Sequence, residues 1–127
     1  MQTSVLLPIK PQFVERIFDG SKQFEFRRRV FKNRNVTKIV VYATAPISKV
    51  IGEFEIEHIL ELEISRLWEH TKEYSGIPQA YFESYFDGKQ TGYAIKIGKT
   101  CIYDKPLELE ADFQIKHAPQ SFMYVNH

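Results

Sequence analysis

The run of residues 36–44, Val-Thr-Lys-Ile-Val-Val-Tyr-Ala-Thr, constrains the fold of this sequence more than any other stretch. It is rich in β-branched and aromatic residues, which favour strands. Because the run is too apolar for the edge of a sheet, we expect a central strand that ends at Ala45-Pro46. In a chain of 127 residues without repeats or linkers, a central strand predicts one domain, residues 1–127, built around one sheet.

A helix and a second strand are predicted before this run. Apolar residues at helical spacing indicate a short helix over residues 11–19, and Gly20 suits its C-terminal cap. Residues 22–28 then alternate with a period of two, with Phe24 and Phe26 on one face and polar residues on the other. We expect the aromatic face to join the core and the polar face to line a cleft or meet water.

The rest of the chain indicates further strands around a helical insert. We expect a bulge or a close backbone approach at Gly52, where the apolar alternation changes phase. After residue 109 the chain loses clear periodicity, so we divide it into a core of about residues 6–109 and a tail, 110–127. The predicted fold class is α+β, a small and mostly antiparallel β-barrel or curled sheet with helices packed at its mouth. The elements expected are strands at 49–58 and 92–98, helices at 66–73 and 77–86, and one or two short strands within 101–109.

The charges are segregated along the chain although the formal net charge is only +1. Residues 21–38 carry seven basic side chains and one acidic one, whereas residues 53–73 carry seven glutamates and two basic side chains. This pattern predicts a basic face and an acidic face, and the basic face is suited to a nucleic acid.

Other features limit the compartment and the cofactors. The single Cys101 can form no internal disulfide, and the short apolar run near the N-terminus lacks the flanks of a secretory signal, so we expect a cytoplasmic protein away from membranes. The histidines are scattered, without metal-ligand spacing, and no glycine-rich phosphate loop is present. We therefore expect neither a metal site nor a cofactor.

The segment from Gly20 to Arg27 concentrates the groups that carry chemistry. Lys22, Glu25 and Arg27 lie at the entry and on the polar face of the predicted strand, and Arg28 and Arg29 follow. Guanidinium groups bind phosphate in bidentate fashion, and a carboxylate beside them accepts from a base amine or holds an arginine in place. The alternative is an ordinary exposed strand whose glutamate and arginine pair within the sheet.

This segment resembles the signature of the ASCH domain, a member of the PUA-like β-barrel superfamily, which reads Gly-x-Lys-x-x-Glu-x-Arg. Gly20, Lys22, Glu25 and Arg27 fill its four positions. The resemblance extends from about residue 6 to residue 109 and includes Val-Tyr-Ala-Thr at 41–44 and Gly-Tyr-Ala-Ile at 92–95. It implies a closed or nearly closed barrel with a cleft lined by the motif, associated with RNA or modified nucleotides.

One branch similar to this family hydrolyses the acetyl amide of N4-acetylcytidine with a lysine, a threonine three residues on and a distant glutamate. Lys22 matches the lysine, Glu25 stands where the threonine would be, and Glu73 is a loose match for the distant acid. Since a carboxylate does not replace a hydroxyl in such a triad, Lys22 and Glu25 are candidate catalytic residues for another reaction, with Lys22 kept charged by its neighbour.

Further residues are candidates for the same cleft. Tyrosines and Trp68 offer rings on which a base can stack, and we place Tyr42, Thr44 and Tyr93 nearest the barrel mouth, whereas core packing is the alternative for each aromatic ring. The candidate ligand-binding residues are Lys10, Lys22, Glu25, Arg27, Arg28, Arg29, Tyr42, Thr44 and Tyr93.

Three hypotheses for function follow. The leading one is a module that binds RNA or a nucleotide-like ligand through the motif. The second is a small hydrolase acting on RNA or on an acylated nucleoside, that is, a ribonuclease or an amidohydrolase. The third is an interaction domain that binds a protein through its acidic face. The sequence leaves the oligomeric state open.

Overall fold

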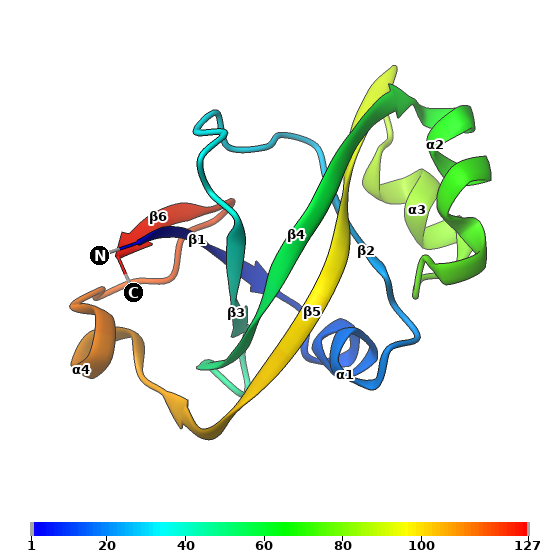
Figure 1. Cartoon of the computed structure of the whole chain (residues 1–127). Coiled ribbons are helices and arrows are strands. Elements are labelled where there is room, and N and C mark those ends of the chain that lie inside the picture. Colours follow the sequence, from blue (N-terminus) through cyan, green and yellow to red (C-terminus); the bar gives the residue numbers. More distant parts are fainter. Residues whose placement is uncertain (1, 127) are drawn as a thin grey trace.

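A single six-stranded sheet organises the molecule. The computed structural model describes residues 2–126, and Figure 1 shows the sheet with helices at its sides and ends. The strand order is β2-β5-β4-β3-β1-β6. The elements are β1 (Thr3–Ile9), α1 (Pro11–Asp19), β2 (Phe24–Arg27), β3 (Lys38–Ala43), β4 (Lys49–Glu63), α2 (Ile64–Thr71), the 3₁₀ helix η1 (Lys72–Tyr74), α3 (Gln79–Tyr85), β5 (Thr91–Leu107), α4 (Leu109–Phe113) and β6 (Met123–Asn126).

The central strand predicted at residues 36–44 is confirmed as β3, which lies between β1 and β4. The sequence prediction missed β1, which pairs with β3 in parallel, with Leu7 opposite Val41. The other strand pairs are antiparallel, so the sheet is mixed. The residues from Ile39 to Ala43 are almost fully buried because β3 has a neighbour on each side and apolar contacts on both faces.

Two long strands, β4 and β5, pair in antiparallel fashion and run across the whole molecule (Figure 1), with α2, η1 and α3 between them in the sequence. The short strands expected within 101–109 are part of a single β5 of 17 residues. The close approach predicted at Gly52 is confirmed, since a Cβ there would lie 2.4 Å from the carbonyl oxygen of Cys101. The register of β4 against β5 also shifts between Val50 and Gly52. Hence only glycine fits at this point of the β4–β5 pair.

The pairings among the described residues run from β2 to β6 without joining the two ends of the sheet. The closed barrel expected from the sequence is therefore not confirmed. The α+β class is established, because the domain combines helices with one sheet.

The predicted first helix is confirmed as α1, and Gly20 caps it in the left-handed conformation at φ 89°. Figure 1 shows α2 and α3 side by side at the end of the molecule where they connect β4 to β5. They close that end of the main core, in which Phe26 of β2 packs edge-on against Phe82 and Phe86. This packing places α3 beside β2.

The tail after residue 109 packs back on the domain, although its sequence showed no periodicity. Strand β6 pairs with β1, with Leu6 opposite Met123, and the ring of Phe122 packs against Phe31. The hydroxyl of Tyr124 accepts hydrogen bonds from the backbone amides of Lys32 and Asn33. The tail therefore ties the loop between β2 and β3 to the edge of the sheet.

None of the helices in the described part of the chain is long and apolar enough to cross a membrane.

Candidate functional site

A cavity of about 430 Å³ lies between α1, β2 and α3 and is closed on one side by the C-terminal segment. Its volume falls in the range of small-molecule sites, about 300–1,000 Å³. Six candidates from the sequence line it: Lys10, Lys22, Glu25, Arg27, Arg28 and Arg29. The other lining residues are Pro8, Ile9, Phe13, Phe26, Ile77, Tyr81, Tyr85, Gln120 and Ser121.

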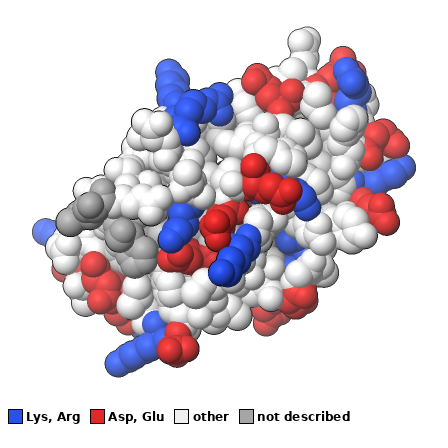
Figure 2. All heavy atoms as spheres, in the orientation of Figure 1, with Lys and Arg blue, Asp and Glu red and all other residues white. Residues whose placement is uncertain are grey.

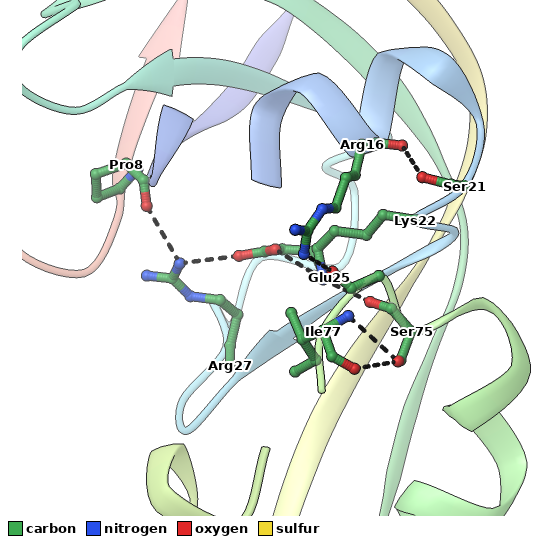
Figure 3. A network of polar contacts seen from close by, with 9 residues as sticks. Pro8, Arg16, Ser21, Lys22, Glu25, Arg27, Ser75 and Ile77 are labelled. Carbon is green, nitrogen blue, oxygen red and sulfur yellow. Dashed lines mark hydrogen bonds and ion pairs between the residues drawn. The ribbon is translucent and has the colours of Figure 1, made fainter. Parts of the chain in front are cut away.

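Lys22 lies at the inner end of this cavity and is only 1% exposed. Its ammonium donates a hydrogen bond of 2.9 Å to the carbonyl oxygen of Ser75 (Figure 3). The same group lies 5.5 Å from the ring centre of Phe13 and 5.0 Å from that of Phe26. The ammonium is thus held by one carbonyl and two aromatic rings.

Burial lowers the pKa of Lys22 from 10.5 to about 8, and the nearby charge of Glu25 only partly opposes this effect. The sequence led us to expect that Glu25 would keep the lysine charged without a lowered pKa, whereas the pKa is lowered because desolvation outweighs the ion pair. Near pH 8 the amine therefore exists in both protonation states, as a group that transfers protons requires.

Glu25 and Arg27 extend the charged network from Lys22 towards the C-terminal segment. One carboxylate oxygen of Glu25 lies 3.8 Å from the Lys22 ammonium, and the other lies 3.3 Å from the Arg27 guanidinium. Arg27 also donates hydrogen bonds to the carbonyl oxygens of Pro8, at 3.5 Å, and Ser121, at 2.5 Å. The expectation that Glu25 is on the polar face of β2 holds, but Glu25 is 6% exposed because this face is enclosed.

The mouth of the cavity combines cations with two tyrosine rings of α3. The Arg28 guanidinium lies 4.2 Å from the ring centre of Tyr85 and donates a hydrogen bond to the backbone carbonyl oxygen of Tyr85. The Lys10 ammonium lies 5.2 Å from the ring centre of Tyr81. Arg28, Arg29 and Lys10 are exposed. The rim thus offers positive charge and aromatic surface together.

Tyr81 and Tyr85 were not among the sequence candidates. Their rings are almost parallel, at 9°, with centres 6.5 Å apart. A signal for them was present, because residues four apart in a helix share one face and both are tyrosines. The sequence did not show that this face turns towards the lysine motif.

The other sequence candidates lie elsewhere, and none of them lines the cavity. Tyr42 is 7% exposed in a second apolar cluster with Leu6 and Val125. The amide of Thr44 donates to the carbonyl of Ile9, and the Tyr93 hydroxyl donates to Glu61 at 3.3 Å.

The remaining two candidates also have structural surroundings of their own. Trp68 packs against Phe82 with ring centres 4.9 Å apart, so it belongs to the core contacts of the helical insert. Glu73 is exposed in η1. Across the described residues, no group of three His, Cys, Asp or Glu side chains is placed to hold a metal ion.

The predicted basic face and acidic face are not separated on the side of the molecule in Figure 2. Figure 2 shows acidic and basic groups side by side over most of the face in view, with a basic group over the loop between β2 and β3. One cause is strand pairing, since Lys38 of β3 lies 2.8 Å from Glu53 of β4. Glu53, one of the glutamates clustered in the sequence, therefore faces a lysine of the neighbouring strand.

The fold is that of an ASCH domain. The crystal structure of ASCH from Zymomonas mobilis superposes with a TM-score of 0.85 at 25% identity, over 97% of this chain and 87% of that one. A mutant form of the same protein superposes with a TM-score of 0.88. The chain belongs to the family described as "Domain of unknown function (DUF365)", whose model matches residues 2–117.

Relatives of known sequence include proteins of very different names. An ASCH domain-containing ribonuclease of Zymomonas mobilis subsp. mobilis is 27% identical over 94% of this chain and 82% of its own length. The large ribosomal subunit protein uL22 of Ureaplasma parvum is 25% identical over 96% of this chain, and the chain spans only 39% of its length. The ATP synthase subunit alpha of that organism is 30% identical, and the chain spans 15% of its length.

Proposed function

We propose that this chain is an RNA-binding domain that takes one nucleotide into the cavity between α1, β2 and α3. The observation that carries the proposal is the composition of the cavity, in which five cations and one carboxylate gather beside two tyrosine rings. The name of the Zymomonas mobilis relative, a ribonuclease, supports an RNA-related role. We infer as well that residues 1–127 form one domain, because one sheet runs from β2 to β6.

The distribution of charge favours one orientation of the nucleotide. The inner part holds both donors, Lys22 and Arg27, and an acceptor, Glu25, as the edge of a base requires. A carboxylate there opposes a phosphate, whereas Lys10, Arg28 and Arg29 at the rim attract one. We propose that the base points inward, with the phosphates at the rim and Tyr81 or Tyr85 stacking on a ring.

A second candidate function is hydrolysis of RNA, and the lowered pKa of Lys22 favours it. An amine that titrates near pH 8 can take a proton from an attacking hydroxyl and return it to a leaving group. The amidohydrolase alternative gains no such support, because Glu25 replaces the threonine and Glu73 does not line the cavity. Lys22 and Glu25 remain the candidate catalytic residues if the chain is an enzyme.

The test is fluorescence anisotropy with short single-stranded RNA and matched DNA at two salt concentrations. The variant Arg29→Gln removes a rim cation, and Lys105→Gln removes a cation at the far end of β5 as a control for net charge. We expect weaker binding and a salt slope smaller by about 0.7 for Arg29→Gln alone. RNA binding that is equal in both variants would contradict the proposal.

The same mixtures distinguish binding from hydrolysis. RNA sampled after incubation should be cleaved by the unchanged chain and not by Lys22→Met if the second candidate is correct. Intact RNA with the unchanged chain, at pH 7 and at pH 9, would exclude it and leave binding alone.

A further inference from the structure

The tight turn formed by Ser75, Gly76 and Ile77 covers Lys22 from the side of the helical insert. The hydroxyl of Ser75 donates to the carbonyl of Ile77 and accepts from the Ile77 amide, so the turn is closed on itself (Figure 3). Ser75 is 3% exposed, and its carbonyl is the acceptor for the Lys22 ammonium. The direction of this carbonyl is therefore fixed by the turn.

The turn is also bound to the segment that leads into β2. The Arg16 guanidinium donates a 2.7 Å hydrogen bond to the backbone carbonyl of Gly76. The backbone amide of Gln23 donates one of 2.8 Å to the carbonyl of Tyr74. The Lys22 amide in turn donates to the carbonyl of Arg16 at 2.9 Å. Two segments more than fifty residues apart are thus held together on both sides of the lysine.

Gly76 is the point of closest contact. It has φ +70°, and a Cβ there would lie 2.4 Å from the Cβ of Lys22 and 2.5 Å from its Cγ. Real Cβ atoms essentially never approach so closely, so any other residue at this position displaces the lysine or the turn. The absence of a side chain at Gly76 therefore makes room for the stem of Lys22.

We propose that the Ser75–Ile77 turn positions the Lys22 ammonium inside the cavity, with Gly76 as the residue that allows it. The inference deepens the proposed function by assigning a role to the helical insert at the same site. The charged groups that face Lys22 are Glu25 from β2 and Arg16 from α1, and the turn supplies a carbonyl and apolar cover. The turn therefore shields the ammonium from water on the side of the helical insert.

The test compares Gly76→Ala with Gly88→Ala. Gly88 also has a left-handed backbone, with φ +81°, but a Cβ there would meet nothing within 4 Å. Both variants therefore carry similar backbone strain, and only one meets Lys22. The readout is the titration of the Lys22 ammonium, followed by NMR of protein labelled with ¹⁵N-lysine, together with the pH profile of RNA binding.

We expect Lys22 to titrate at a pKa of about 8 in the unchanged chain and in Gly88→Ala, and to move towards 10.5 in Gly76→Ala. A rise of about one pH unit or more is expected when water reaches the group. An unchanged titration in a folded Gly76→Ala variant would overturn the inference.

If Gly76→Ala does not fold, Ser75→Ala replaces it. This variant removes the hydroxyl that closes the turn and leaves the carbonyl. It should raise the pKa of Lys22 by a smaller amount, and no rise would overturn the inference. If the titration shifts in the variant but the unchanged chain binds no RNA, the positioning role is supported and the proposed function is contradicted. The two failures are therefore distinguishable.

Discussion

The carboxylate of Glu25 and the ammonium of Lys22 lie 3.8 Å apart, both almost fully buried, without the short contact of a strong ion pair. The pair is thus too loose to offset the desolvation of the amine, which is why the pKa of Lys22 falls to about 8. This relationship makes the stability of the domain depend on pH through one residue.

We expect the effect of Lys22→Met on the free energy of unfolding to depend on pH. The lysine is protonated up to pH 10.5 in the unfolded chain and up to about pH 8 in the folded one. The unfolded chain therefore binds more protons between these values, and the free energy of unfolding rises with pH across this window. Relative to the unchanged chain, the free energy of unfolding of the variant should therefore be about 2–3 kcal/mol lower at pH 10 than at pH 7. Urea unfolding at both pH values tests this, and equal effects at the two would contradict it.

Glu25→Gln should lower the pKa of Lys22 below its value in the unchanged chain. The carboxylate is the charge that raises this pKa, and its removal leaves desolvation and Arg16, which both lower it. NMR titration of labelled lysine measures the change. Glu83→Gln, an exposed glutamate of α3, is the matched control and should leave the titration where it was.

Tyr81→Ala and Tyr85→Ala should each weaken RNA binding if the rings stack on a base. Loss of one stacking partner costs about 1–3 kcal/mol, or roughly 5- to 150-fold in affinity. Tyr93→Ala removes a tyrosine that contacts Glu61 and does not line the cavity, so the affinity of this variant for RNA should be unchanged. Equal losses for all three variants in the anisotropy assay would assign the effect to folding.

Arg27→Ala should release the C-terminal segment. Its guanidinium bonds to Glu25, Pro8 and Ser121 and so joins β2 and β1 to that segment. Hydrogen bonds to a charged group are worth about 1.5–3 kcal/mol each, and we expect a total loss of about 2–4 kcal/mol. Hydrogen exchange should become faster around residues 119–126, and protection equal to that of the unchanged chain would argue against this role.

The sequence predicted the parts of this molecule that depend on neighbouring residues. The helix before Gly20, the central strand β3 and the phase of β2 all follow from local patterns, and so does the gathering of Lys22, Glu25 and Arg27. A short motif on one strand keeps its residues together in any fold that retains the strand.

The parts that were missed depend on contacts between distant segments. The Ser75 carbonyl reaches Lys22 across 53 residues, and the Ser121 carbonyl reaches Arg27 across 94. Backbone carbonyls carry no sequence signal, so neither contact was predictable. Strand β1 was missed because its apolar run is short and includes Pro8. Tyr42 was named as a candidate although it does not line the cavity, because the local pattern did not show that β3 is buried on both faces.

The pairing of β6 with β1 brings Thr3 opposite Asn126, so the two ends of the described chain leave the sheet side by side (Figure 1). Neighbouring strands are only about 5 Å apart, a gap that the loop of another protein can span. A unit of this shape can be spliced into a host polypeptide with little distortion of either partner, and joining its ends with a short linker would allow new termini to be cut elsewhere.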